Sequence, residues 1–167
     1  MALFRGCSLF LNEFRLSDSV EYSPPEIGID RAWYKAGAMT APVPVDRGTK
    51  PMTARYKIAG MDPSAFLFFG LVPGFRARLT VRRAFRFAGR PVFLHDEMEG
   101  FIDTIRPDSS SDDKLGVGQE MTLSVNYYRV SVDGVLPLLE INPALGVRKI
   151  WGMDAQRISS MLTGVTG

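Results

Sequence analysis

Hydrophobic and polar residues alternate with a period of two over most of this chain, as is typical of half-buried β-strands. In 52–58 the even-numbered positions are apolar and the odd-numbered positions are polar. The stretches 79–87 and 92–105 also alternate, and Gly89 lies in the short segment that joins them. The pattern predicts a mainly β protein, a β-sandwich or partial barrel built from antiparallel strands.

The alternation changes phase near the middle of a later stretch. Odd-numbered positions are apolar in 121–127, and the even-numbered positions take over from Tyr128. Such a change indicates a β-bulge or a change of partner strand. Asp133-Gly134 then predicts a hairpin with a two-residue loop, since both residue types tolerate positive φ. We expect the returning strand, 135–141, to lie at a sheet edge because Pro137 cannot donate a backbone hydrogen bond.

Two segments predict helices. Asp62 is suited to cap a short helix whose first position is Pro63, and Gly70 is suited to close it. This helix is so apolar that we expect it to cover a sheet. A second helix is expected over 155–162. The Asp-, Ser- and Gly-rich segment 107–118 predicts a mobile loop.

The segment 23–51 is too long to be an ordinary loop. It contains five prolines and, at most, one predicted strand at 27–34. Long irregular segments are uncommon inside compact domains and are usually functional or disordered. Disorder is disfavoured because several large apolar side chains would remain in water; they are Ile27, Ile29, Trp33, Tyr34, Met39, Val43 and Val45. The segment either packs on its own body or, as we favour, is an arm that packs on another subunit.

Composition sets the outer bounds. A chain of 167 residues fits one domain, 1–167, which buries roughly 70% of the unfolded surface. The net charge of +2 is too balanced to indicate a nucleic-acid partner. Cys7 is the single cysteine, so no intrachain disulfide is expected. With no apolar run near the roughly 20 residues of a membrane span, and no signal-peptide pattern, we expect a soluble cytoplasmic protein without membrane anchoring.

No pattern in the chain predicts catalysis. His95 is the only histidine and lies in an alternating strand beside acids, without a nucleophile motif. One histidine and one cysteine cannot supply a zinc site. The acids of 96–113 match no calcium loop, and Gly116-Val-Gly118 lacks the context of a dinucleotide site. We therefore expect no enzyme activity, no cofactor and no metal.

Six arginines gather in 76–90: Arg76, Arg78, Arg82, Arg83, Arg86 and Arg90. Together with neighbouring phenylalanines they could form a basic, stacking surface for nucleic acid. However, Phe85 and Phe87 are expected on the core face, opposite Arg82 and Arg86. Pairing of 79–87 with the acid-bearing strand would neutralise the arginines across the hairpin. A nucleic-acid-binding β-domain remains the alternative, and a small β-barrel enzyme or ligand binder is the weakest interpretation.

Several segments, in this order, resemble the major tail tube proteins of contractile-tailed bacteriophages and related phage-tail-like bacteriocins. They are Ser8-Leu-Phe-Leu11, Tyr34–Val43, Phe68-Phe-Gly-Leu71, Tyr127–Gly134, Glu140-Ile-Asn-Pro143, Gly146–Arg148 and Gly152–Asp154. The resemblance covers nearly the whole chain. The chain departs from the family pattern at Ala38 and Thr40, where Gly and Asp are usual, and in the arginine-rich 76–90.

The resemblance implies a β-sandwich protomer with one short helix that forms hexameric rings. The rings stack into a tube, and strands from all protomers close a continuous inner β-barrel. It implies a structural role in the virion, assembly in the cytoplasm of a host bacterium, and a conduit for genome ejection. Implied partners are further copies of the chain, the sheath, the baseplate, the tail terminator, and, within the lumen, the tape measure protein and DNA.

Three sets of residues are candidates for this role. Contacts of the arm are expected at Trp33, Tyr34, Met39, Pro42 and Val43. Contacts of the C-terminal segment are expected at Gly146, Arg148, Trp151 and Asp154. Candidate barrel or lumen positions are Arg82, Arg86, Glu97, Glu99, Thr122 and Ser124. Which surface meets which stays open at this stage.

Overall fold

β-Strands make up most of the computed structural model, which describes residues 2–17, 20–60, 63, 66, 76–109 and 117–154. The strands are β1 (Ala2–Leu11), β2 (Phe14–Ser17), β3 (Val20–Ser23), β4 (Ile29–Tyr34), β5 (Val43–Thr49), β6 (Met52–Ala59), β7 (Ala77–Phe87), β8 (Arg90–Pro107), β9 (Gly118–Val132), β10 (Leu136–Asn142), β11 (Val147–Ile150) and β12 (Met153–Asp154). One turn of 3₁₀ helix, η2 (Pro143–Leu145), follows β10. The mainly β prediction is confirmed.

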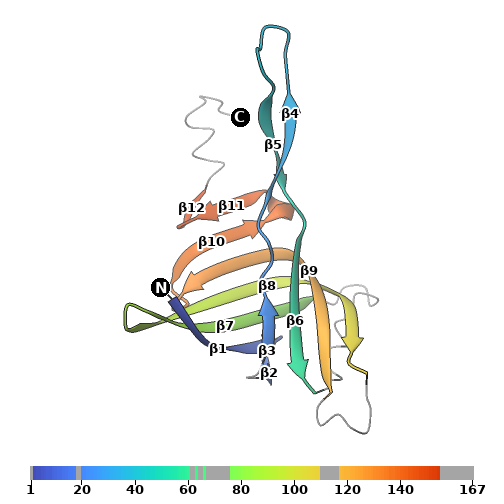
Figure 1. The fold of residues 1–167 in the computed structure, drawn as a ribbon, viewed down its shortest axis with the longest axis vertical. Helices are drawn as coiled ribbons and strands as arrows, with labels where there is room; N and C mark the ends of the chain where they lie inside the picture. Colours follow the sequence, from blue (N-terminus) through green and yellow to red (C-terminus); the bar gives the residue numbers. More distant parts are fainter. Residues whose placement is uncertain are drawn as a thin grey trace.

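A 10-stranded antiparallel sheet forms the body, and the β4–β5 ribbon stands apart from it (Figure 1). The main order is β12-β11-β10-β9-β8-β7-β1-β2, while β6 pairs with both β9 and β3. β9 pairs with β8 and also with two further strands. Its first half, up to Val125, pairs with β6, and Tyr128–Val132 pairs with β10. The register with β8 skips Asn126. The predicted phase change in β9 is therefore both a bulge and a change of partner.

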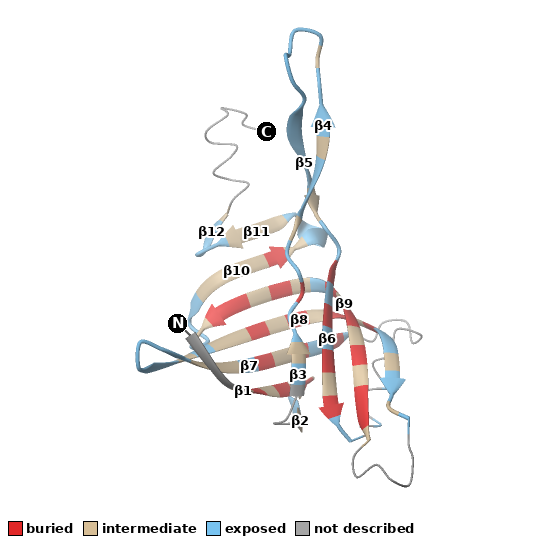
Figure 2. Ribbon diagram, viewed as in Figure 1, coloured by how far each residue is buried: buried red, intermediate tan, exposed pale blue. Residues whose placement is uncertain are grey.

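The core lies where β3 and β6 fold over the β7–β8 part of the sheet. Tyr22 of β3 reaches across this space, and its hydroxyl donates to Asp96 of β8 over 3.1 Å. The alternation in β6 is confirmed, because its even-numbered side chains are buried. Figure 2 shows the same alternation as bands of buried residues along β6, β8 and β9. Large, fully buried core residues include Leu9, Leu11, Tyr56, Leu79, Val81, Met98, Ile102, Met121 and Leu123.

Tight turns with positive φ connect consecutive strands. They lie at Asn12–Glu13, Ala88–Gly89, Asp133–Gly134 and Trp151–Gly152. In three of them the flanking residues pair directly, which leaves a two-residue loop. Positive φ at both loop positions matches the twist of antiparallel strands. The hairpins predicted at Gly89 and at Asp133-Gly134 are confirmed, but the second loop has three residues rather than two, because Val132 pairs with Leu136.

The prediction of an edge position for Pro137 is only locally right. β10 lies between β9 and β11, so it is an internal strand in the sheet order. β11, however, pairs only with Leu139–Asn142. Pro137 lies before this paired part, next to a register shift. The proline is tolerated because its missing donor falls outside the β10–β11 ladder.

Parts of the sequence-based prediction fall outside the described residues. These are the helix at 62–70, apart from Pro63 and Phe66, the helix at 155–162, and the centre of the loop 107–118. Among the described helical residues, none belongs to a helix long and apolar enough to cross a membrane.

Candidate interaction surfaces

The β4–β5 ribbon, which we call the arm, projects from the body as an isolated hairpin (Figure 1). In its register Trp33 lies opposite Pro44, and Tyr34 lies opposite Val43. Successive side chains of a strand point to opposite faces. The arm therefore has a Trp33 face, formed by Arg31, Trp33, Pro44 and Asp46, and a Tyr34 face, formed by Ala32, Tyr34, Val43 and Val45.

Both faces of the arm are exposed and largely apolar. Trp33 keeps 70% of its surface and Tyr34 keeps 57%. Val43, Val45 and Met39 at the tip are also exposed, as is Pro42. All five arm residues singled out from the sequence thus lie in the same projecting element. That element is the extended segment expected within 23–51.

The prediction of one strand in the arm was wrong, because there are two. Pro42 and Pro44 argued against a second strand, β5, because proline has no backbone N–H and is rare in strands that are hydrogen-bonded on both sides. A two-stranded ribbon pairs each strand on one side only, so Pro44 is accommodated opposite Trp33. The alternation of Val43 and Val45 about Pro44 was the signal for this strand.

The base of the arm is fixed to the body by an ion pair. Nη1 of Arg148, in β11, donates to Oδ2 of Asp46 over 2.8 Å. The backbone N–H of Gly48 also donates to the Asp46 carboxylate, over 2.8 Å. The hydrogen bond from Arg148, followed by that from Gly48, lowers the pKa of Asp46. Arg148 therefore contacts the arm of its own chain.

The other predicted C-terminal residues lie around η2 and the β11–β12 turn. Gly146 has φ of 65° and caps η2. Trp151 occupies the β11–β12 turn with φ of 52° and 60% exposure, and Asp154 ends β12 opposite Lys149. Exposed apolar residues gather along this segment, namely Leu145, Ile150, Trp151 and Met153. Ile150 and Met153 were not identified from the sequence, although their apolar character flanking Trp151-Gly152 was visible.

All six candidate lumen residues lie on the face of the sheet opposite the core. Arg82 and Arg86 are exposed, and Glu97, Glu99, Thr122 and Ser124 are half-buried. The register aligns Glu97, Arg129, Glu140, Lys149 and Asp154 across β8 to β12. Charges alternate along this row, and Lys149 Nζ lies 3.8 Å from Glu140 Oε2. Opposite charges across strands stabilise a sheet.

The arginine cluster is divided between the two faces of β7. Arg78 lies 3.9 Å from Glu99, and Arg82 stacks on the ring of Phe10. Arg83 points to the interior, where its side chain is 18% exposed and its Nη2 lies 2.7 Å from Asp96. These cross-strand ion pairs confirm the pairing predicted from the hairpin.

The phenylalanines near the arginines are placed differently from the prediction. Phe87, expected on the core face, is 59% exposed at the end of β7. Phe93 is 46% exposed and pairs with Ala84, which puts it on the same face as Arg82. Phe10 shares this face too, through its contact with Arg82. Aromatic and basic groups therefore adjoin here, although through other residues than those predicted.

Asp96 is the centre of a buried polar cluster between β3, β7 and β8. It is fully buried and accepts hydrogen bonds from Arg83 of β7 and from Tyr22 of β3. Burial raises the pKa of Asp96, while the hydrogen bond and charge of Arg83 lower it. Burial, followed by the charge of Asp96, raises the pKa values of Tyr22 and Tyr128. The cluster ties β3 to β7 and β8.

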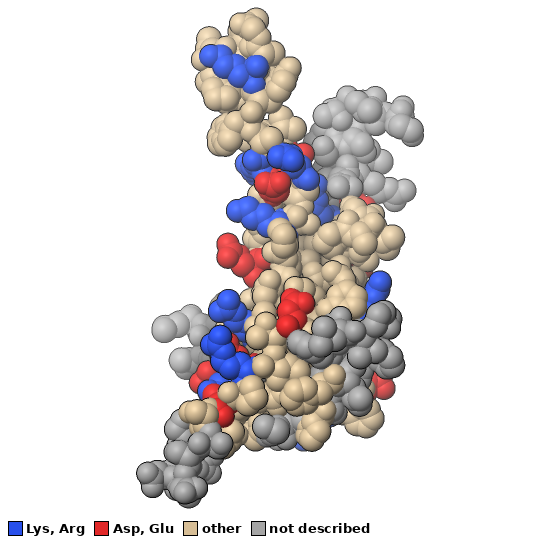
Figure 3. Space-filling model, turned by 90° about the vertical axis from the view of Figure 1, so that its right-hand side faces the viewer, with Lys and Arg blue, Asp and Glu red and all other residues tan. Residues whose placement is uncertain are grey.

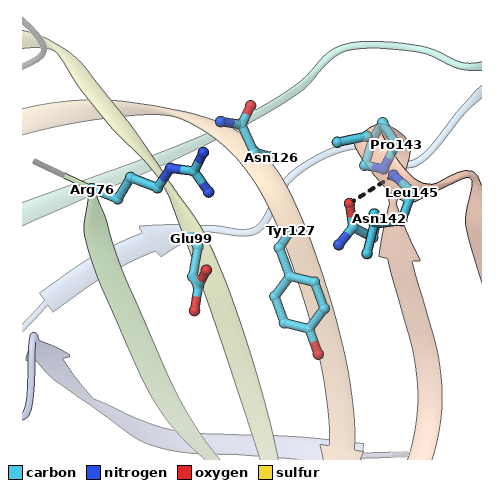
Figure 4. A pocket seen from close by; sticks show the side chains of 8 residues that line it. Arg76, Glu99, Asn126, Tyr127, Asn142, Pro143 and Leu145 are labelled. Carbon is cyan, nitrogen blue, oxygen red and sulfur yellow. Dashed lines mark hydrogen bonds between the residues drawn. The ribbon is translucent and has the colours of Figure 1, made fainter. Parts of the chain in front are cut away.

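An open depression of about 600 Å³ lies between the start of β7, β8, β9 and η2. Figure 4 shows Arg76, Glu99 and Tyr127 along one side and Asn142 to Leu145 along the other. Asn142 Oδ1 accepts from the Leu145 N–H over 3.3 Å. Among the described residues that line it, none is a serine, threonine or cysteine. Within the described residues no group of three or more His, Cys, Asp or Glu could hold a metal.

The described part of the chain thus combines a broad antiparallel sheet with a projecting ribbon that exposes apolar side chains. The chain belongs to the family described as phage tail tube protein FII, whose model matches residues 3–157. It is therefore a structural component of a viral tail. No curated protein matches the chain at the sequence level.

Two solved structures of the anti-feeding prophage have the same fold. A chain of its cap, described as the tube terminating cap, matches with a TM-score of 0.57 and 11% identity, covering 75% of this chain and 86% of that chain. A chain of its baseplate, in a six-fold symmetrised structure, matches with a TM-score of 0.50 and 9% identity, covering 75% of this chain and 91% of that chain. At these identities the likeness concerns the fold.

Proposed function

We propose that this chain is the repeating subunit of the inner tube of a contractile tail. Six copies form a ring, rings stack inside the sheath, and the lumen is the conduit for DNA ejection. Membership of the tail tube family supports the tube, and the fold shared with a six-fold symmetrised assembly supports the ring. The structural observation that supports self-assembly is the exposure of apolar side chains on the arm.

The arm supports self-assembly because it cannot bury itself. Its base is held by Asp46 and Arg148, so Trp33 and Tyr34 project into solvent with more than half of their surfaces exposed. Leaving several large apolar side chains in one exposed patch marks an interaction site. Stacking rings head to tail needs two different matching surfaces on each copy. We assign one of them to the arm together with the apolar C-terminal segment, Leu145–Met153, which adjoins the base of the arm through Arg148.

The outer strands of the sheet support the proposal that six copies form a ring. The sheet order ends at β12 and β2, and among the described strands each of these pairs with one neighbour only. Open sheet edges favour pairing with further strands, and closing six sheets into one barrel removes them. In this arrangement the core faces outward and the opposite face lines the lumen, including Arg82, Glu97 and Ser124. Alternating charges on that face would limit tight phosphate contacts with passing DNA.

Electron microscopy of the purified chain tests the proposal. We expect rings or hollow tubes in negative stain, and elution well above the mass of a monomer in size-exclusion chromatography. A chain that stays monomeric at high concentration contradicts the proposal. If such a monomer also shifts DNA in a salt-dependent manner, the nucleic-acid-binding alternative based on Arg76–Arg90 gains support. Copurification with sheath, baseplate, terminator and tape measure proteins tests the remaining partners.

A further inference from the structure

The face of the sheet opposite the core is not uniform in charge. Charges alternate along the row of residues that runs from Glu97 to Asp154 across β8 to β12. In the view of Figure 3, basic and acidic side chains likewise lie next to one another on the body. Between Glu97 and the β7–β8 turn, however, the ionisable residues of β7 and β8 on this face are Arg82, Arg86 and His95. This end of the face is therefore basic.

An open depression of about 560 Å³ lies at this basic end. Its lining includes Gly6, Ser8, Arg82, Ala84, Phe93 and His95. The small residues lie close together, since Gly6 pairs with Ala84, and Ser8 pairs with Arg82. Arg82 in turn pairs with His95 across β7 and β8. The depression thus combines room for a bulky group with the N–H donors of a guanidinium and an imidazole.

Arg82 is oriented by an aromatic ring rather than by a carboxylate. Its guanidinium carbon lies 5.0 Å from the centre of the Phe10 ring, and a stacked guanidinium still presents its N–H edge for bidentate hydrogen bonds. Among the described residues, neither Arg82 nor Arg86 forms an ion pair with a carboxylate. Arg86 Nε donates to the Gly89 carbonyl oxygen over 3.2 Å. An anion that binds here therefore breaks no ion pair of the described residues, and the stacking of Arg82 lowers the entropy lost on binding.

We propose that this basic end of the face, formed by Arg82, Arg86, Phe93 and His95, contacts the phosphate backbone of duplex DNA. A basic surface without facing acids attracts a polyanion, and the guanidinium fork matches the geometry of phosphate. The inference rests on the proposed function, in which this face lines the lumen and DNA is the polyanion that passes along it.

The contact is weak in one copy and is repeated around the ring. Two arginines per copy neutralise roughly two phosphates, which gives a modest, salt-dependent affinity. Equivalent contacts on neighbouring copies raise the effective concentration of binding groups. The alternating row that begins at Glu97 limits the basic surface on one side. DNA is thus kept near the wall without being fixed at one position, and its base sequence is not read because contacts to phosphate carry no sequence information.

Photo-crosslinking from position 93 tests this contact. Phe93 is 46% exposed, so p-benzoylphenylalanine replaces it without disturbing the core. The matched control carries the same group at position 14, where Phe14 of β2 is 76% exposed. Tubes are assembled in the presence of a short fluorescent DNA duplex and irradiated. We expect a protein–DNA product from position 93 that disappears as the salt concentration rises, and little product from position 14.

Substitutions then show which arginine is responsible. Adding Arg82→Gln to the position-93 chain should lower the yield of protein–DNA product at least about fivefold. Arg90→Gln removes one positive charge at the same turn, where Arg90 is exposed, but from the other face of the sheet. It should leave the yield unchanged.

Tubes that form normally but give no more product from position 93 than from position 14 overturn this inference and leave the proposed function intact. An unchanged yield with Arg82→Gln overturns it as well. If polyglutamate suppresses the product as effectively as unlabelled duplex does, the surface fits an acidic polypeptide and the assignment to DNA fails. Failure of the unmodified chain to form tubes overturns the proposed function. Irradiation of the unassembled chain with the duplex then decides whether the DNA contact exists without it.

Discussion

At the scale of single residues, Asp96 shows what the sequence could not reveal. The alternation of 92–105 predicted a strand, but it predicted neither a buried carboxylate at Asp96 nor an arginine, Arg83, that turns inward to meet it. The two compensate each other at 2.7 Å across β7 and β8. Pairing of one residue with another 13 positions away depends on the hairpin register, which alternation alone leaves undetermined.

Replacing Arg83 by Met should destabilise the protomer in a pH-dependent way. The folded-state pKa of Asp96 is already raised, and removal of Arg83 raises it further. The contribution of such a group to stability is fully present below its unfolded pKa and is lost as the pH rises through the folded pKa. We expect a loss of about 3–5 kcal/mol at pH 7.5, and a smaller loss at pH 4.5, by urea denaturation.

The control for this prediction is Arg78→Met. Arg78 is 55% exposed and its contact with Glu99 is 3.9 Å long, so its loss should cost less than about 1 kcal/mol at both pH values. An Arg83→Met protein that loses the same stability at pH 4.5 and pH 7.5 would show that the charge of Asp96 is not what Arg83 compensates.

Gly100 is a second residue whose role appears only in three dimensions. It lies at the bulge where the β8–β9 register shifts, and a Cβ there would lie 1.8 Å from the Ser124 carbonyl oxygen. The obstacle is backbone, so Gly100→Ala should cost at least about 1–3 kcal/mol. Gly37→Ala is the control, because a Cβ there meets nothing within 4 Å. Equal denaturation midpoints for the two variants would contradict this account.

Trp151 combines backbone strain with exposure. A bulky residue at φ of 52° costs about 1–2 kcal/mol relative to an ordinary conformation, yet the indole is 60% exposed. We expect Trp151→Asn to keep or raise the thermal stability of the protomer while raising the critical concentration for assembly more than tenfold. Asp133→Asn, at φ of 50°, should change neither. Normal assembly of Trp151→Asn would remove this residue from the interface.

At the scale of elements, alternation predicted β6, β7, β8 and β9 well, because each buries one face only. The arm was predicted as a segment that must be covered, and its apolar content carried that prediction. Its second strand was missed, since two prolines obscured the alternation of Val43 and Val45. The short strands β11 and β12 were not predicted either, because four and two residues are too few for a period to be recognised.

The combined change Trp33→Ala and Met39→Ala should abolish polymerisation and leave the protomer folded. Both side chains project from the arm, at 70% and 39% exposure, so their removal opens no cavity in the core. Truncating an anchor of an interface typically costs at least about 2 kcal/mol. Sedimentation measures assembly, and circular dichroism measures folding. Thr40→Ala on the same arm is the control, and tubes formed by the double variant would exclude an essential role for these anchors.

At the scale of the whole molecule, the body has a hydrophobic core of its own. The arm and the C-terminal segment contribute no buried residue to this core. The sequence indicated this division through composition alone: Pro-rich 23–51 lacks the alternation of the body. It could not show that Asp46 and Arg148, 102 residues apart, hold the base of the arm against the C-terminal segment. Such a contact depends on the curvature of the complete sheet.

This division predicts that thermal stability depends on concentration. Binding that occurs only in the folded state adds to the free energy of unfolding, and here the ligand is the chain itself. We expect the melting temperature of the unmodified chain to rise between low and high micromolar concentration. The Trp33→Ala, Met39→Ala variant should melt at one temperature throughout, close to the dilute value of the unmodified chain. Calorimetry measures both, and a concentration-independent melting temperature of the unmodified chain, in samples where microscopy shows tubes, would mean that assembly contributes little to holding the protomer folded.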